Sequence, residues 1–322
     1  MRLDFSYDSD FIQLYNSIGS TDKGKKFLDL FGISRRNLDP AATGKLYFSK
    51  TDEDRTVDPN SNCGSATKTP NHFISEIFKG LNKLNSVALI HKELKEIYGV
   101  KEANDCILNL IEGAVYCHDL SSSASVNMPY CWSFACINIL EGRKYGNLQS
   151  MPPKRSDSFI AILIESVFEL SAEQCGAIAL SDLFVALSWF YKNEGTDPDK
   201  DQKKIENDLQ RIIHSLNMTF RAGNQSCFTN FSMMDRPILS ETFKGLKYPD
   251  GSKMDIEYIQ KIQSVFMEFM SKKDPVTKLP YRFPVVTCNI KTGDEDEIMD
   301  KQFLEEVCKY NIFKLAAIIR TS

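Results

Sequence analysis

The amino-acid sequence predicts an α/β protein with a largely parallel sheet. From residue 71 onward, segments with apolar residues at helical spacing alternate with short apolar, β-branched runs. This order is typical of parallel strands that are joined by helices. No internal repeat or low-complexity tract interrupts it, and the balance of 42% hydrophobic and 25% charged residues is that of an ordinary globular chain.

The first 70 residues are expected to form a polar N-terminal extension ahead of the α/β part at 71–322. A short amphipathic helix is predicted up to Gly19. The segment 51–70 is rich in Asp, Ser, Asn, Thr and Pro, which predicts an extended surface stretch.

The α/β part begins with helical spacing and then alternates. Two long buried helices are expected between 156 and 193, divided by Gly176 and by the Ser181–Asp182 pair, which can cap the second helix. The other predicted helices lie at 73–81, 87–97, 103–113, 203–218, 256–269 and 301–309. The predicted strands and apolar runs lie at 114–120 (buried, with a polar tip), 129–140, 226–234, 282–290 and 313–319.

Charge, hydropathy and cysteine content exclude several classes of protein. The net charge of −4 offers no basic surface for nucleic acid. No apolar run reaches the roughly 18 residues of a membrane helix, and the N-terminus shows no secretion signal, so a cytoplasmic location is expected. Nine cysteines without a CxxC pair predict reduced, mostly buried thiols and no metal site in this chain.

Polar residues gather where an amphipathic helix gives way to an apolar strand at 221–230. Polar groups that enter a core without hydrogen bonds cost about 1–3 kcal/mol each. These side chains therefore either tie down a neighbouring loop or meet a polar ligand at a strand end, where α/β sheets bind ligands. They are Asn224, Gln225, Ser226, Thr229 and Asn230.

Two further groups of residues could carry chemistry. His118 and Asp119 either form an acid–base pair or satisfy a backbone carbonyl and cap a turn, and Cys131 is either a reactive or a packed thiol. Lys154 and Arg155 precede a long predicted helix, whose N-terminus either cradles a phosphate with them or follows a solvated loop. No P-loop, GxGxxG, HExxH or GxSxG motif is present.

Five strings, taken together and in this order, resemble the anaerobic (class III) ribonucleoside-triphosphate reductases, the glycyl-radical members of the ribonucleotide reductase family. They span about residues 55–290. The strings are TVDPNSN at 56–62, EGAVYCHDL at 112–120, GAIALSDLF at 176–184, RAGNQSCFTNFSMMDRP at 221–237 and RFPVVTCNI at 282–290.

The resemblance implies a ten-stranded α/β barrel of two five-stranded halves with a finger loop through its centre. It also implies the reduction of ribonucleoside triphosphates to deoxyribonucleoside triphosphates. A thiyl on the finger loop abstracts the 3′ hydrogen, the 2′ hydroxyl leaves as water, and formate or a thiol system supplies the electrons. A glycyl radical, installed by a separate radical-SAM activase, generates the thiyl.

By the same resemblance, Cys131 is the catalytic partner thiol that faces the reacting sugar. Lys154 and Arg155 bind the phosphate of a (d)NTP effector, near helices at about 151–218 that make the contact of a homodimer. The implied substrate-binding residues are His118, Asp119, Asn224, Gln225, Ser226 and Asn230.

The chain departs from the family pattern after Ile290. It contains no finger-loop cysteine string, no RxxGY-type glycyl-radical segment and no CxxC pairs for the C-terminal zinc, and an amino-terminal ATP cone is missing. We therefore expect the amino-terminal part of a reductase, which binds no cofactor itself and is inactive without a complementing C-terminal part that carries the glycyl radical and the zinc.

Half of a barrel is expected to expose unpaired strand edges and an apolar inner face, and so to associate. Two alternatives remain open at this point. The first is a degenerate, non-catalytic nucleotide-binding or regulatory fragment. The second is a different glycyl-radical enzyme with the same barrel, such as an acyl-cleaving lyase.

Overall fold

The computed structural model describes residues 7–49, 70–117, 120–121, 131–145, 147–173, 176–221, 225–276, 278, 281, 283–312 and 317–321. The chain divides into two compact units. The first is Met1–Tyr130 with Ala222–Gln225, and the second is Cys131–Arg221 with Ser226–Ser322.

The first unit is helical. Its core joins residues from both sides of position 70, among them Phe11, Leu28, Val87 and Ile107, so the boundary that we expected at residue 70 does not separate two packing units. The helices are α1 (Ser9–Gly19), α2 (Asp22–Phe31), α3 (Pro40–Ser49), α4 (Pro70–Tyr98) and α5 (Val100–Glu112).

Helix α4 merges the two helices predicted at 73–81 and 87–97. Gly80, near the end of the first of these segments, does not end the helix. A Cβ atom at Gly80 would lie 2.6 Å from the carbonyl oxygen of Asn37, so the glycine permits a close approach of the segment between α2 and α3 to the helix.

The buried strand predicted at 114–120 is wrong for the residues that the structure describes. Gly113 ends α5 in the left-handed region with φ 82°, and the amides of Ala114 and Val115 both bond back to the carbonyl oxygen of Asn109. Val115 and Tyr116 are 54% and 82% exposed, so this segment is a surface turn.

The second unit contains a five-stranded, fully parallel sheet in the order β1-β4-β7-β8-β9, which confirms the predicted α/β class. The strands are β1 (Trp132–Ser133), β4 (Ile178–Leu180), β7 (Thr229–Met234), β8 (Val285–Ile290) and β9 (Ala317–Thr321). A ten-stranded barrel remains a prediction.

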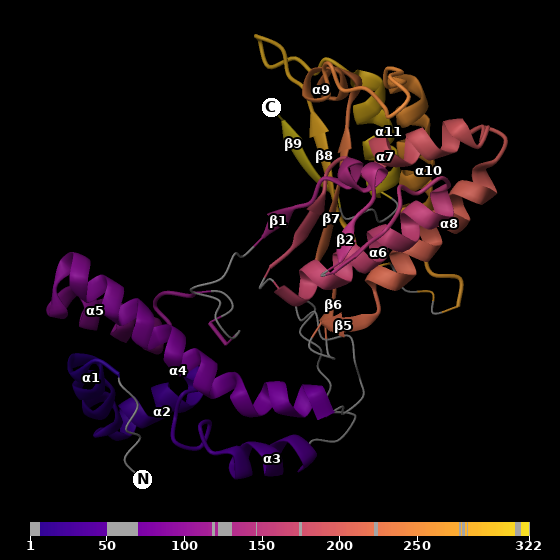
Figure 1. Ribbon diagram of the computed structural model, residues 1–322. Helices are drawn as coiled ribbons and strands as arrows, with labels where there is room; N and C mark the ends of the chain where they lie inside the picture. Colours follow the sequence, from indigo (N-terminus) through magenta and orange to yellow (C-terminus); the bar gives the residue numbers. More distant parts are fainter. Residues whose placement is uncertain are drawn as a thin grey trace. The chain divides into compact units, whose positions relative to one another are not determined.

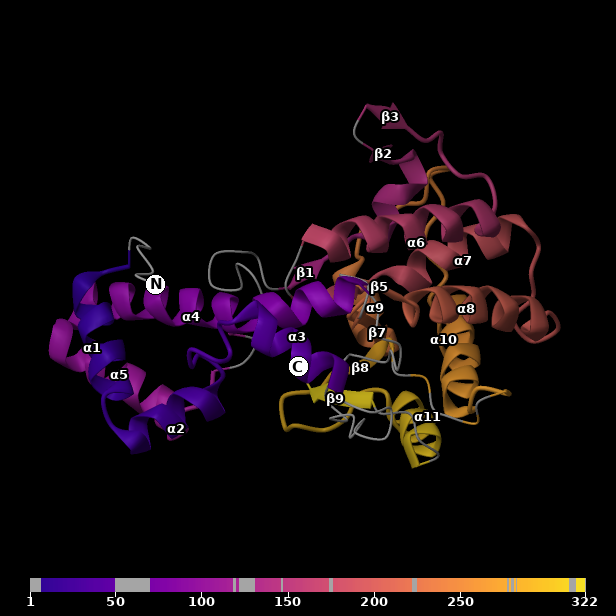
Figure 2. The same ribbon diagram turned by 90° about the horizontal axis from the view of Figure 1, so that it is seen from below.

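Helices connect successive strands and lie together on one side of this sheet (Figures 1 and 2). They are α6 (Ser156–Glu173), α7 (Leu183–Asn193), α8 (Gln202–Leu216), α10 (Ile256–Ser271) and α11 (Lys301–Ile312), with the short α9 (Arg236–Thr242) after β7. The smaller elements are the 3-10 helix η2 (Cys136–Glu141) and the strand pairs β2 (Lys144–Tyr145) with β3 (Leu148–Gln149) and β5 (Thr219–Arg221) with β6 (Gln225–Ser226).

Strand β4 was not predicted, because it lies inside the apolar run at 156–193. A fully buried strand and a buried helix are equally apolar, so periodicity alone does not separate them. Among the described residues, no helix is both long and apolar enough to cross a membrane.

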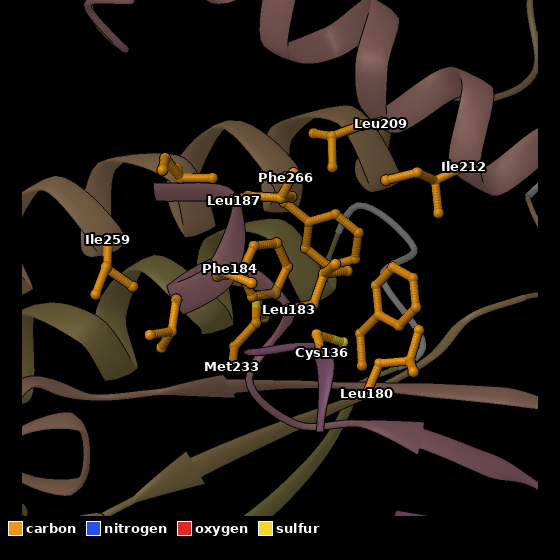
Figure 3. Close-up of a cluster of buried hydrophobic side chains, with 14 of the residues drawn as sticks. Cys136, Leu180, Leu183, Phe184, Leu187, Leu209, Ile212, Met233, Ile259 and Phe266 are labelled. Atoms are coloured by element: carbon orange, nitrogen blue, oxygen red, sulfur yellow. The ribbon is translucent and has the colours of Figure 1, made fainter. Parts of the chain in front are cut away.

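The core of the second unit lies between the sheet and the helices (Figure 3). Phe184 on α7, Phe231 on β7 and Phe266 on α10 meet there, with ring centroids 5.0–6.4 Å apart. This aromatic contact fixes which face of β7 is turned to the helices.

Candidate functional site

The sheet has one apolar face and one face on which polar side chains lie among apolar ones. In β7, Phe231 and Met233 belong to the core, whereas Asn230 and Ser232, which alternate with them, are half-buried. Their register partners in β8 follow the same alternation, since Ser232 pairs with Thr287. The expectation of an exposed apolar inner face is therefore wrong for β7 and β8.

An open hollow of about 630 Å³ lies on the face with the polar side chains. Among the described residues that line it, none is charged. Its apolar lining includes Ala177, Ala179, Met234 and Ile238. Its polar lining consists of Cys131, Ser133, Ser181, Asn230, Ser232, Thr242, Thr287 and Asn289.

Two amide side chains in the hollow are oriented by the sheet itself. Asn230 Nδ2 donates to Thr287 Oγ1 at 2.8 Å, and Asn289 Nδ2 donates to the carbonyl oxygen of Met233 at 3.1 Å. Among the described residues, the Oδ1 atom of each amide has no hydrogen-bond donor. Two preoriented acceptors thus remain for a ligand with hydroxyl or amino donors.

Cys131 lies at the edge of the same hollow, directly before β1. The residue is exposed, and its Sγ accepts the amide N–H of Ala177 at 3.3 Å. The structure therefore brings two of the predicted site residues, Cys131 and Asn230, to one surface.

The other predicted residues of the 221–230 segment do not line the hollow where they are described. The Ser226 hydroxyl is buried and donates to the carbonyl oxygen of Asn217 at 3.0 Å, which is the loop-tying alternative. Thr229 is fully buried and alternates in phase with the core residues Phe231 and Met233. Gln225 is described only through its backbone in β6, and Asn224, His118 and Asp119 lie outside the described residues.

The structure does not support the phosphate cradle predicted at Lys154 and Arg155. Both side chains are exposed, and Arg155 pairs with Asp157 at 3.2 Å. The N-terminus of α6 already holds a carboxylate, because the amide of Ser156 donates to Glu194 Oε1 at 2.6 Å. The effector assignment therefore remains a prediction from the resemblance alone.

Glu194 is itself held by further donors. Its other oxygen accepts from Lys204 Nζ at 2.6 Å and from the Ser156 hydroxyl at 3.0 Å. Burial alone would raise the pKa of Glu194, but these hydrogen bonds outweigh it, so the pKa lies below its ordinary value.

Asp182 is a buried carboxylate that the sequence did not single out as a site residue. It was expected to cap α7, but it makes no side-chain bond to that helix. Its two oxygens accept the amides of Cys136 and Ile137 at 2.8 and 3.0 Å. Burial, and then the neighbouring Asp182 carboxylate, raise the pKa of the Cys136 thiol well above its ordinary value.

The described part of the chain was searched for clusters of metal-ligating side chains. No group of three or more His, Cys, Asp or Glu side chains lies there in a position to hold an ion.

The sequence model of the anaerobic ribonucleoside-triphosphate reductases matches residues 79–320, and the chain belongs to this family. It is similar to the crystal structure of the anaerobic ribonucleotide reductase from Thermotoga maritima in complex with dATP and CTP, with a TM-score of 0.81 and 26% identity over 100% of this chain and 51% of that one.

Two further solved structures are similar over the whole chain. The Thermotoga maritima enzyme with dATP bound in the specificity site has a TM-score of 0.78 and 27% identity, over 52% of its own length. Another structure described as an anaerobic ribonucleotide reductase has a TM-score of 0.81 and 28% identity, over 50% of its length. The chain thus spans about half the length of the solved structures it matches. A search of curated proteins found no match.

Proposed function

We propose that this chain forms one side of the substrate cavity of an anaerobic ribonucleoside-triphosphate reductase. The observation that carries the proposal is the uncharged polar row on the sheet face opposite the helices, with Cys131 at its edge. A complementing C-terminal part would supply the other side of the cavity. That part would also carry the glycyl radical, which provides the hydrogen-abstracting thiyl, and the zinc.

The chemistry of the hollow fits a ribose better than a phosphate. Amide oxygens and hydroxyls can bond the sugar hydroxyls, whereas no cation among the described lining residues could neutralise a phosphate. A substrate radical also requires a site from which water and stray hydrogen donors are excluded, and a closed barrel provides one. In this setting Asn230 orients the sugar and Cys131 is the partner thiol beside it.

Two similar solved structures support the class of ligand. The Thermotoga maritima enzyme was solved with dATP and CTP, and again with dATP in its specificity site. We therefore propose a ribonucleoside triphosphate as substrate and a (d)NTP as effector. The complete enzyme would further require a radical-SAM activase and a homodimer.

The proposal is tested by supplying a C-terminal part of a reductase. The chain is co-expressed with the C-terminal part of a reductase, activated anaerobically, and assayed for CTP reduction with and without formate. Turnover supports the proposal. Nucleotide binding without turnover in every combination would instead support the non-catalytic regulatory alternative.

The first prediction concerns Cys131. We expect Cys131→Ala to lose at least about 10³-fold in turnover while it retains nucleotide binding, because a reacting thiol has no substitute in alanine. Cys106→Ala is the matched control, since Cys106 is also an exposed free cysteine but lies on α5. Full turnover in Cys131→Ala would remove this residue from the site.

A further inference from the structure

Strand β1 is attached to the sheet by few bonds of its own. It is two residues long, lies at the sheet edge and pairs with β4 alone. Its amide bonds run from Trp132 to the carbonyl oxygen of Ala177 at 2.9 Å and from Phe134 to that of Ala179 at 2.8 Å. An edge strand this short opens easily unless another interaction holds it.

Asp182 provides that interaction. The amides of Cys136 and Ile137, which bond its carboxylate, begin η2 just after β1. Asp182 itself follows β4, after Ser181. The carboxylate therefore links the segments that leave two neighbouring strands, and it satisfies amides that a helix start would otherwise leave unpaired.

The Asp182 carboxylate bonds η2 and does not cap α7, the helix that begins directly after it. This choice of partner indicates that the link between the two segments is specific. An aspartate in the position before a helix ordinarily accepts an amide of that helix. Asp182 occupies this position for α7, yet both of its oxygens serve η2 instead. Its 6% exposure means that the carboxylate is largely withdrawn from water and depends on these two donors.

We infer that Asp182 is a positioning residue, which holds β1 against β4 and thereby sets the place of the Cys131 thiol at the hollow. The attachment of β1 follows from the geometry alone. The importance of the thiol's position rests on the proposed function.

The unaltered chain allows a first test by amide hydrogen exchange. The hairpin of β2 and β3 is a matched control, since each of its strands is also two residues long and no carboxylate bond to it is described. We expect peptides covering 132–137 to exchange at least tenfold more slowly than peptides covering 144–149. Equal rates would overturn the inference, and this measurement needs no variant to fold.

The second test compares two aspartates of the same kind. Asp235 also bridges two segments, because its oxygens accept the amides of Ile238 at 2.9 Å and Lys291 at 2.6 Å. Asp182→Asn should speed exchange at 132–137 at least tenfold and leave β7 and β8 protected. Asp235→Asn should instead speed exchange near Lys291 and leave 132–137 unchanged. Slow exchange at 132–137 in Asp182→Asn would contradict the inference.

Turnover of the reconstituted enzyme separates positioning from general stability. We expect Asp182→Asn to lower kcat at least tenfold with KM within twofold, because the thiol is displaced while the amides of β7 and β8 stay in place. Unchanged kcat in a variant with a released β1 would refute the positioning role and leave the proposed function intact. If the unaltered enzyme shows no turnover, the proposed function fails, and the exchange rates still decide the attachment of β1.

Discussion

Single residues on β7 and β8 decide what each face of the sheet can do. Phe231 and Met233 turn one face to the helices, whereas Asn230 and Ser232, which alternate with them, line the uncharged hollow on the other face. On the hollow's face, the bond from Asn230 to Thr287 joins a side chain of β7 to a side chain of β8. It keeps the Asn230 amide in one orientation, which leaves its carbonyl oxygen for a ligand.

The hydrogen bond from Asn230 to Thr287 is expected to make a measurable contribution to stability. We expect Thr287→Val, which keeps the shape but removes the acceptor, to lower the free energy of unfolding by about 1 kcal/mol. Ser232→Ala, on the same face, should change it by less than about 0.5 kcal/mol. Urea denaturation followed by tryptophan fluorescence measures both, because Trp132 and Trp189 lie in the second unit. Equal effects would show that the bond does not contribute.

At the scale of elements, two helix starts in the second unit, those of α6 and η2, are held by carboxylates from other segments. Glu194, after α7, accepts the first amide of α6, and Asp182 accepts the amides that begin η2. A carboxylate at a helix N-terminus interacts favourably with the helix dipole. The N-termini of α6 and η2 therefore bind carboxylates of the chain itself, and the start of α6 is not open to a phosphate.

The Glu194 contact predicts a dependence of stability on pH. Because the folded-state pKa of Glu194 lies below its ordinary value, its contribution is present at pH 7 and is lost as the pH falls below about 4. We expect Glu194→Gln to lower the free energy of unfolding by about 1 kcal/mol at pH 7 and by much less at pH 3. Urea denaturation at both pH values is the measurement.

Glu165→Gln is the control for this prediction, since Glu165 is exposed on α6, the helix whose first amide Glu194 accepts. It should leave the free energy of unfolding nearly unchanged at both pH values. A Glu194→Gln variant with the same loss at pH 3 as at pH 7 would contradict the ionic role of Glu194.

At the scale of the whole molecule, the parallel sheet has two edge strands, β1 and β9. Each edge presents backbone donors and acceptors that a further strand could pair with. The face of β7 and β8 that the helices leave uncovered carries polar side chains. We therefore expect association at the two edge strands and not through an apolar inner face.

We expect the chain by itself to form oligomers, and to form a defined one-to-one complex with a complementing C-terminal part. Size-exclusion chromatography with light scattering distinguishes these states, with the chain measured alone and after mixing. A single monomeric peak for the chain alone, unchanged by the added part, would contradict the prediction.

Much of the fold follows from local sequence patterns. Helices such as α8 and α10 and strands β7 and β8 were predicted close to their bounds, because their apolar residues repeat at 3.6 or 2 positions and turns or caps delimit them. The strand predicted at 114–120 is wrong and β4 is not predicted. An apolar run by itself indicates neither whether its residues are buried nor whether they form a helix or a strand.

The sequence by itself determined the parallel α/β class, the family resemblance and two residues of the hollow, Cys131 and Asn230. Side-chain alternation and local chemistry are properties of neighbouring residues, so they can be seen along the chain. Only the tertiary structure decided that Ser226 ties a loop, that Glu194 fills the start of α6 and that Asp182 serves η2 rather than its own helix. These contacts join residues 9 to 46 positions apart, and no local pattern encodes which distant partner a polar group will meet.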